Sequence, residues 1–293
     1  MSANTTDHVG EHSSKTTLLV RRIVAYTVLV LLTVIAIFPF VIMVINSTRA
    51  HPDIQKGFKF VIGGSFWVNL KSVFNNTDIP LSIGLRNSFI VAGSCTLLST
   101  YFSALTAYGI HVYEFRLKKF AFAFILVIMM VPAQVSALGF YRMMFALELT
   151  NNFIPLIVPS IAAPATFFFM KQYMESSLPL EIVEAARIDG CNEFRTFNTI
   201  VMPIMKPAMA VQGIFTFVGN WNNYFIPSLI LDQKELKTLP IMVAQLRNAD
   251  FVKFDMGQVY MMIFVAIIPV IVVYLALSKF IIRGIALGSV KGL

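Results

Sequence analysis

The chain has 293 residues, of which 57% are hydrophobic and only 13% charged, and its mean hydropathy is +0.75. Soluble domains carry about 25% charged residues, so this composition excludes a water-soluble enzyme and indicates an integral membrane protein. The formal net charge of +8 does not point to nucleic acid, because basic residues of membrane proteins concentrate in cytosolic loops and near anionic headgroups. Two cysteines, Cys95 and Cys191, lie in an apolar run and a polar loop, and we expect no disulfide between them.

Residues 1–20 are rich in Ser, Thr and His and predict a disordered cytosolic tail, whereas residues 21–293 form the expected membrane domain. A helix needs about 20 apolar residues to cross the hydrocarbon core. The expected spans lie at about 23–46, 87–110, 120–144, 152–172, 207–231 and 257–280. The sequence therefore predicts an all-α integral membrane protein with six transmembrane helices.

Two basic clusters, Arg21-Arg22 and Lys118-Lys119, flank expected spans on the same side of the membrane. Basic residues near span ends concentrate on the cytosolic side. We therefore expect both termini to be cytosolic, together with the loops that follow the second and fourth spans.

No Asp, Glu, Lys or Arg lies in the six apolar runs on which the expected spans are based, which are residues 23–48, 87–113, 120–141, 149–170, 207–231 and 256–278. Ion-coupled carriers usually place an ionisable group in the membrane, which disfavours that mechanism, although backbone carbonyls are able to bind sodium. The chain has no Gly-Lys dipeptide and hence no P-loop, and no His, Asp or Glu cluster lies in the bilayer. We expect no catalytic residue, metal or cofactor here, so any uphill transport must be powered by another subunit.

Residues 175–206 form the longest expected cytosolic segment and read as two short helices joined by a glycine. Ser177 is suited to cap the first helix, with Pro179 in its first turn. Gly190 would end it, because glycine enters the left-handed conformation without strain. Asn192 would cap the second helix.

Helical spacing groups apolar and small residues on one face of each short helix. These faces comprise Leu178, Ile182, Ala185 and Ala186 in the first helix, and Phe194, Phe197 and Val201 in the second. Two prolines, Pro203 and Pro207, mark the end of the second helix and the start of the fifth span. An amphipathic element of this kind suits docking into a partner groove, but the pattern alone equally permits a loop that folds back on its own bundle.

The same segment resembles the EAA signature of ABC importer permeases, E-A-A-x3-G-x9-I-x-L-P. The matching residues are Glu184, Ala185, Ala186, Gly190, Ile200 and Pro203, and Met202 replaces the Leu. The resemblance implies a type I importer permease of a bacterial or archaeal cell membrane, in which this EAA loop carries a coupling helix that fits a groove on the ATPase subunit. Together with Asp189, these residues would be contact or geometry residues.

Further features are the six spans, Asn220-Trp221-Asn222-Asn223-Tyr224 in the fifth, Thr238-Leu239-Pro240 after it, and the terminal Ser289-Val290-Lys291-Gly292. In these features the rest of the chain resembles the carbohydrate permeases akin to the second subunit of the maltose transporter. The resemblance implies a second six-span permease, two ATPase subunits that hold ATP and Mg, and an extracellular solute-binding protein. Within the 232–257 loop, the expected contacts to that binding protein are Asn248, Ala249 and Asp250. The terminal segment, Ser289–Leu293, would lodge at the ATPase dimer interface or form a frayed tail.

The densest polar and aromatic cluster within any expected span consists of Asn220, Trp221, Asn222, Asn223 and Tyr224. Sugars bind by stacking on aromatic rings and by hydrogen bonds to amides, so this cluster is a candidate translocation path. Gln134 joins it, as an amide beside a kink predicted at Pro132. The same residue types also mark the membrane interface and bond neighbouring helices, which leaves a structural role open.

The function expected from the whole sequence is that of a permease subunit of an ATP-driven sugar or oligosaccharide importer. The same machine with glycerol phosphate as cargo is the nearest alternative. An ion-coupled carrier or channel is the alternative from another class.

Overall fold

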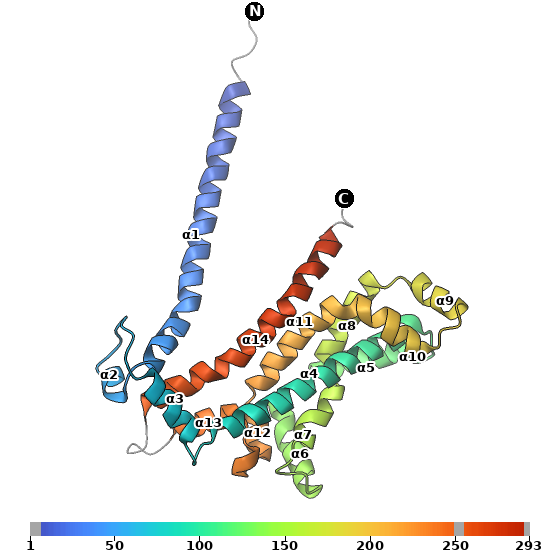
Figure 1. Cartoon of the computed structure of the whole chain (residues 1–293). Coiled ribbons are helices and arrows are strands. Elements are labelled where there is room, and N and C mark those ends of the chain that lie inside the picture. Colours follow the sequence, from blue (N-terminus) through green and yellow to red (C-terminus); the bar gives the residue numbers. More distant parts are fainter. Residues whose placement is uncertain (1–6, 249–254, 290–293) are drawn as a thin grey trace, which may run out of the picture. The chain divides into compact units, whose positions relative to one another are not determined.

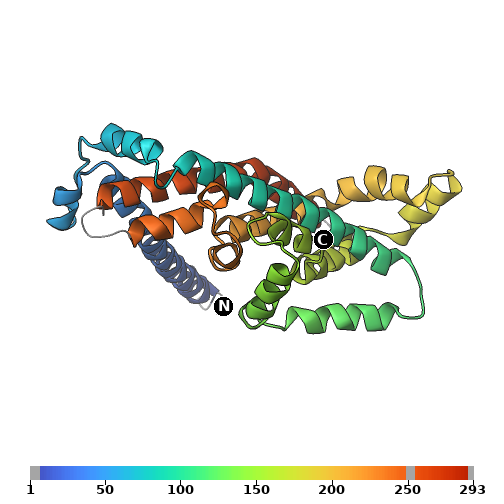
Figure 2. The same ribbon diagram turned by 90° about the horizontal axis from the view of Figure 1, so that it is seen from below.

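The computed structural model describes residues 7–248 and 255–289 as an all-helical chain (Figures 1 and 2). It divides into two compact units, residues 1–69 with 255–261 and residues 70–254 with 262–293. Among the described residues, five helices are long and apolar enough to cross a membrane, and a bent helix pair makes a sixth crossing if its two helices form one span. This agrees with the all-α membrane fold and the six spans that the sequence predicts.

The first unit contains α1 (Asp7–Ser47), α2 (His51–Gln55) and the first residues of α3 (Phe66–Asn75) and α14 (Met256–Ser289). The Asn69 side chain donates hydrogen bonds to the carbonyls of Ser47 and Arg49, at 2.9 and 3.0 Å. A Cβ at Gly257 would lie 2.9 Å from the Arg49 carbonyl oxygen. This close backbone approach explains why glycine occupies that position.

The predicted disordered tail is corrected, because α1 begins at Asp7 and so includes residues 7–20. The cause is that a helix, once nucleated in the apolar run that follows, extends at little cost per residue. This stretch contains no proline to stop it.

The second unit is built around α4 (Leu81–Val112), α8 (Pro164–Ser177) and α11 (Met202–Trp221), which pack side by side. The remaining elements of this unit are α5 (Lys118–Met129), α6 (Ala133–Ala146), α7 (Ile154–Ile157), η1 (Val158–Ile161), α9 (Leu180–Ile188), α10 (Glu193–Thr196), η2 (Phe197–Val201), α12 (Phe225–Ile230), η3 (Lys234–Leu236) and α13 (Leu239–Arg247). Small side chains on α4, such as Ser99, Ser103 and Ala104, are buried in these contacts. Small residues let membrane helices approach closely, which explains this packing.

The third expected span is broken rather than kinked. α5 and the helix that follows it differ in direction by 98°, and Pro132 is the N-cap residue of α6. Proline disfavours helical backbone in the residue before it and cannot donate to the preceding turn, so the helix stops and restarts. The fourth span likewise consists of three short pieces that together cover Ile154–Ser177.

Candidate functional site

The predicted glycine stop in the EAA loop is confirmed. Gly190 has a φ of +78°, directly after α9. Its amide donates to the Arg187 carbonyl and the Cys191 amide to the Ala186 carbonyl, both at 3.0 Å. These two bonds form a Schellman motif, which satisfies carbonyls that the helix end would leave without partners.

The predicted cap of the second short helix is also confirmed, since the Asn192 side chain accepts a hydrogen bond from the Arg195 amide at 2.9 Å. The expected boundary at Pro203 and Pro207 is wrong. α10, η2 and α11 continue as one helical stretch from Glu193 to Trp221. Pro203 is the second residue of α11 and follows η2 without a break, so it lies inside this stretch rather than at its end.

The predicted cap at Ser177 is wrong as well. Ser177 is the last residue of α8, and Pro179 is the N-cap residue of α9, with no side-chain cap bond. Proline restricts the residue before it to extended backbone, and Leu178 accordingly has φ −117° and ψ 94°. A two-residue linker therefore separates the helices.

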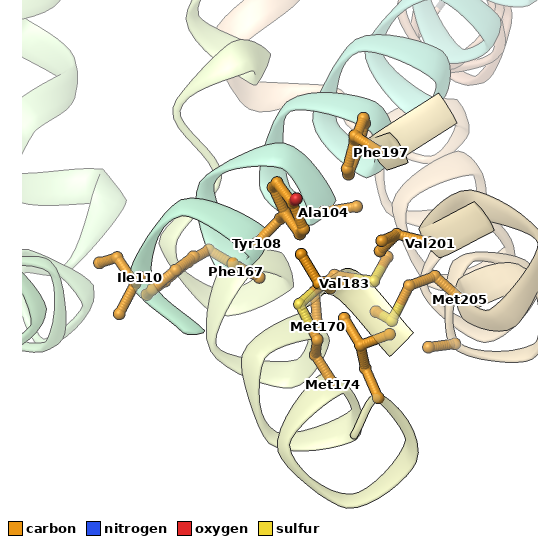
Figure 3. Close-up of a cluster of buried hydrophobic side chains, with 13 residues drawn as sticks. Ala104, Tyr108, Ile110, Phe167, Met170, Met174, Val183, Phe197, Val201 and Met205 are labelled. Carbon is orange, nitrogen blue, oxygen red and sulfur yellow. The ribbon is translucent and has the colours of Figure 1, made fainter. Parts of the chain in front are cut away.

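One face of α9 packs on the membrane helices (Figure 3). Val183 and Ala186 are buried, and Val183 belongs to a cluster formed by α4, α8 and the α10–α11 stretch. Ile182 and Ala185, which the sequence predicts to lie on the same side as Leu178 and Ala186, are both exposed, so the four residues do not share one environment. Val183 and Ala186, which are three residues apart, face the bundle. Ile182 and Ala185 each precede one of them and point about 100° away around the helix.

The second short helix packs in the same way, since Phe197 and Val201 are buried in this cluster. Phe194, which the sequence predicts to lie on the same face as Phe197 and Val201, is not part of this buried face, because its side chain is 71% exposed. The exposed side of the loop also carries Glu184, Ala185, Ile188, Asp189 and Pro203, whereas Ile200 is half-buried. An apolar surface with charged neighbours is thus left uncovered in this chain.

Glu193 ties the EAA loop to α4. Its carboxylate accepts hydrogen bonds from the Tyr108 hydroxyl and from Arg187 Nε, each at 2.7 Å. The guanidinium carbon of Arg187 also lies 5.4 Å from the centre of the Tyr113 ring. We call Tyr108, Tyr113, Arg187 and Glu193 the clasp, because together they join both short helices of the loop to the end of α4.

No charged residue lies between Lys206 and Asp232, so the membrane-crossing part of the long helix begins after Lys206. Glu193 therefore lies outside the membrane-crossing part. The hydrogen bond from Arg187, followed by that from Tyr113, lowers the pKa of Glu193 to about 2. Burial and the neighbouring Glu193 raise the pKa of Tyr113. The clasp therefore keeps its carboxylate charged and its phenol neutral at neutral pH.

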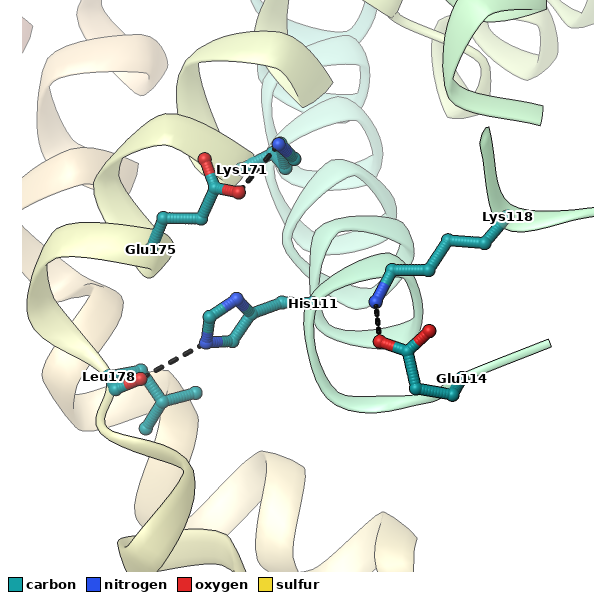
Figure 4. A network of polar contacts seen from close by, with 6 residues as sticks. All are labelled: His111, Glu114, Lys118, Lys171, Glu175 and Leu178. Atoms are coloured by element: carbon teal, nitrogen blue, oxygen red, sulfur yellow. Dashed lines mark hydrogen bonds and ion pairs between the residues drawn. The ribbon is translucent and has the colours of Figure 1, made fainter. Parts of the chain in front are cut away.

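His111, near the end of α4, makes a second contact to the segment that precedes α9 (Figure 4). His111 Nε2 lies 3.1 Å from the Leu178 carbonyl oxygen. Since a carbonyl only accepts, Nε2 carries the proton in this contact. This hydrogen bond gives His111 a structural role at the end of α4.

Asn220 and Asn223 line a cavity of about 270 Å³ bounded by α6, α7 and η1. The rest of its wall is mostly apolar and includes Phe140. Asn220 also donates to the Thr216 carbonyl at 2.9 Å. Two of the candidate path residues are therefore brought together at one hollow.

Tyr224 lines a different cavity of about 370 Å³, and Asn248 lies on the wall of the same cavity. Two residues predicted for different roles, sugar passage and binding-protein contact, thus meet at one site. Ala249 and Asp250 lie outside the described residues. So do the last four residues of the terminal segment 289–293.

The other path candidates are placed differently. Trp221 is 3% exposed, stacks on Phe217 and donates from Nε1 to the Ala266 carbonyl at 3.0 Å. These contacts make Trp221 a packing residue. Asn222 and Gln134 are exposed and line neither cavity.

The sequence did not reveal the side-chain hydrogen bonds that join residues far apart along the chain. Besides Glu193 in the clasp, fully buried Asn87 donates to the carbonyls of Glu235 and Lys237, at 2.8 and 3.0 Å. An asparagine inside an apolar run was the available signal, because a buried amide needs partners. Within residues 7–248 and 255–289, no group of three or more His, Cys, Asp or Glu side chains is placed to hold a metal ion.

Known proteins resemble the chain along most of its length. A family model described as "Binding-protein-dependent transport system inner membrane component" matches residues 99–286. The arabinooligosaccharides transport system permease protein AraQ of Bacillus subtilis is 32% identical over 279 residues, 93% of this chain and 97% of AraQ. The lactose transport system permease protein LacG of Rhizobium radiobacter is 32% identical over 269 residues, 92% of this chain and 96% of LacG.

A relative with another printed cargo is the sn-glycerol-3-phosphate transport system permease protein UgpE of Yersinia pestis, 29% identical over 269 residues, 90% of this chain and 95% of UgpE. The fold is similar to a chain in the crystal structure of a bacterial ABC transporter involved in the import of the acidic polysaccharide alginate. The TM-score is 0.78 at 20% identity, over 95% of this chain and 99% of that one. The chain therefore belongs to the family of inner membrane components of binding-protein-dependent transport systems, and is a multi-pass permease rather than an enzyme.

Proposed function

We propose that this chain is one permease subunit of an ATP-driven importer that moves a sugar or an oligosaccharide into the cell. The observation that carries the cargo class is the similarity, over more than nine-tenths of the chain, to permeases named for arabinooligosaccharide and lactose transport. The two cavities support it, because they offer amides and an aromatic ring, the groups that bind sugar hydroxyls and ring faces.

The family implies an ATPase and a binding protein as partners. The proposal adds a second six-span permease as a heterodimer partner, two ATPase subunits and an extracellular site for the binding protein. Both termini and the EAA loop lie in the cytosol. ATP and Mg stay on the ATPase subunits, and this chain contributes no catalytic group.

The EAA loop is the contact with the ATPase in this proposal. Its exposed side offers Ala185, where a partner can approach the backbone closely, and the apolar side chains of Ile188 and Phe194. Glu184 and Asp189 lie exposed beside them and would set the orientation of docking. The buried side, with Val183 and the clasp, would carry the movement of the ATPase into α4.

The sugar would enter from the binding protein near Asn248 and Tyr224, and pass on to the hollow lined by Asn220 and Asn223. Both cavities lie at α12 and the segments next to it. Fully buried Asn87 holds the segment before α13 in place, so this entry would be rigid on its α4 side.

Glycerol phosphate is the alternative cargo, in keeping with the similarity to UgpE. A phosphate would require cationic side chains along its path. The cavity at Tyr224 contains Lys237 but also Asp232, and the cavity at Asn220 has no charged lining residue. This charge balance favours a neutral cargo.

The decisive assay reconstitutes the complete transporter in vesicles with its binding protein. We expect uptake of a labelled oligosaccharide that requires both ATP and the binding protein, and no uptake of glycerol 3-phosphate. Uptake driven by an imposed ion gradient without ATP would overturn the proposal. Glycerol 3-phosphate uptake with no sugar uptake would overturn the cargo assignment.

A further inference from the structure

A cavity of about 420 Å³ lies where α4 ends, α5 begins and α8 carries its last charged residues. It is separate from the cavities at Asn220 and Tyr224. Its charged lining residues are Glu114, Arg116, Lys118, Lys119, Lys171 and Glu175. Four cations and two carboxylates leave this hollow positively charged.

Both carboxylates are engaged with lysines (Figure 4). Lys118 Nζ lies 2.6 Å from Glu114 Oε1, and Lys171 Nζ lies 2.7 Å from Glu175 Oε1. Arg116 and Lys119 are exposed, and neither forms an ion pair with an acidic side chain in the parts of the chain described. The excess positive charge therefore belongs to these two residues.

The two ion pairs position the ammonium groups without using up their donors. An ammonium carries three N–H donors, and each pair uses one of them. The Lys171 side chain is only 14% exposed, and its Nζ lies 4.3 Å from the centre of the Phe122 ring. These contacts hold Lys171 in place at the wall, ready for a further acceptor.

The surroundings of the cavity are those of a membrane surface. Its apolar wall consists of Ile110, Phe115 and Phe122. Along α5 the apolar side chains of Phe120, Phe124 and Val127 are 67%, 54% and 62% exposed. In a spanning segment, exposed apolar side chains of this kind contact acyl chains. A ligand with a charged end in the cavity and a hydrocarbon tail along α5 fits both surfaces.

We propose that this cavity binds the phosphate of an anionic phospholipid head group, with Arg116 and Lys119 as its main charge partners. Phosphate oxygens accept hydrogen bonds from guanidinium and ammonium groups, and basic pockets between membrane helices bind such head groups. A zwitterionic lipid brings a positive group into a hollow that already carries excess positive charge, so it binds more weakly. The inference depends neither on the cargo nor on the coupling role of the EAA loop.

The test uses the complete purified transporter and native mass spectrometry with added phosphatidylglycerol or phosphatidylcholine. The double variant Arg116→Gln/Lys119→Gln removes the unpaired charges. The matched control, Arg142→Gln/Lys234→Gln, removes two exposed cations from elsewhere in the same unit. We expect phosphatidylglycerol to bind about 25-fold more weakly to the double variant, since each of the two basic residues near an anionic lipid contributes a factor of about five. Phosphatidylcholine binding and the control variant should be unchanged.

Equal retention of phosphatidylglycerol by the double variant and the control would overturn the proposal. Inorganic phosphate that binds the cavity as tightly as phosphatidylglycerol does would also overturn it, because the lipid tail would then add nothing and the cavity would be a site for a free anion. If the double variant does not assemble with its partners, the single variants Arg116→Gln and Lys119→Gln decide. Each should weaken phosphatidylglycerol binding by a few-fold, and no loss in either contradicts the assignment.

Discussion

Removal of the Glu193 carboxylate should loosen the EAA loop from α4. The buried Tyr108 hydroxyl, 3% exposed as a residue, would lose a charge-assisted bond that contributes about 1.5 kcal/mol. The Arg187–Glu193 pair adds little to this figure, because its side chains are 38% and 42% exposed and solvent screens the two charges. Glu193→Ala should thus lower the free energy for local opening of the loop by about 1.5 kcal/mol, which raises the open population roughly tenfold.

Hydrogen exchange of the assembled transporter measures this opening directly. We expect amides in residues 180–196 of Glu193→Ala to exchange roughly tenfold faster, while amides of the α4 interior stay protected. Glu114→Gln is the matched control, because Glu114 pairs only with Lys118 four residues away and makes no tie between loop and α4. Tyr108→Phe should have a smaller effect, since Glu193 keeps Arg187 as its partner.

The same variant tests the transmission that we propose. A loop that is loosely held on α4 should let the ATPase hydrolyse ATP with less transport per ATP. Equal exchange and equal coupling in Glu193→Ala and Glu114→Gln would refute the reasoning, because the clasp would then hold nothing that matters for movement.

The remaining predictions concern single positions. Gly190→Ala should lower the stability of the assembled transporter by about 1 kcal/mol, measured as a lower melting temperature, whereas Gly190→Asn should cost less because asparagine tolerates positive φ. Asn87→Leu should lower stability by about 2 kcal/mol in denaturant titrations, because the Glu235 and Lys237 carbonyls lose the buried amide that donates to them. Trp221→Phe should lower the melting temperature and leave the transport KM unchanged, whereas Asn223→Ala should raise the transport KM. The pKa of Glu193 is lowered to about 2. The stability that the clasp adds is therefore present above the ordinary carboxyl pKa and is lost only as the pH falls towards 2. Hydrogen exchange of the loop, corrected for its intrinsic rate, should thus be the same at about pH 6 and pH 8.

Local chemistry of the EAA loop could be predicted from the sequence. The stop at Gly190 and the cap at Asn192 depend on residues a few positions away, and both are found in the structure. The cap at Ser177 failed although it is also local, because the effect of Pro179 on Leu178 outweighs the capping preference of serine.

Long-range features could not be predicted in the same way. Tyr108 and Glu193 are 85 residues apart, and only the packing of α4 against the loop brings them together. The burial of Ala186 and exposure of Ala185 follow from the rotation of α9, which is set by tertiary contacts that spacing alone leaves open. Likewise, Pro132 predicted a disturbance of the third span but not the 98° change in direction.

Cross-linking of the EAA loop to its partner tests the central claim most directly. The variant Ile188→Cys, in a Cys191→Ser background, places one accessible thiol on the exposed side of α9, since Ile188 is 86% exposed and Cys95 is buried. In inverted membrane vesicles that contain the whole transporter, a short bifunctional thiol–amine reagent should join this thiol to the ATPase subunit, with a yield that changes when ATP is bound. Labelling of the same thiol by an impermeant reagent from outside intact cells, with no cross-link to the ATPase, would contradict the account.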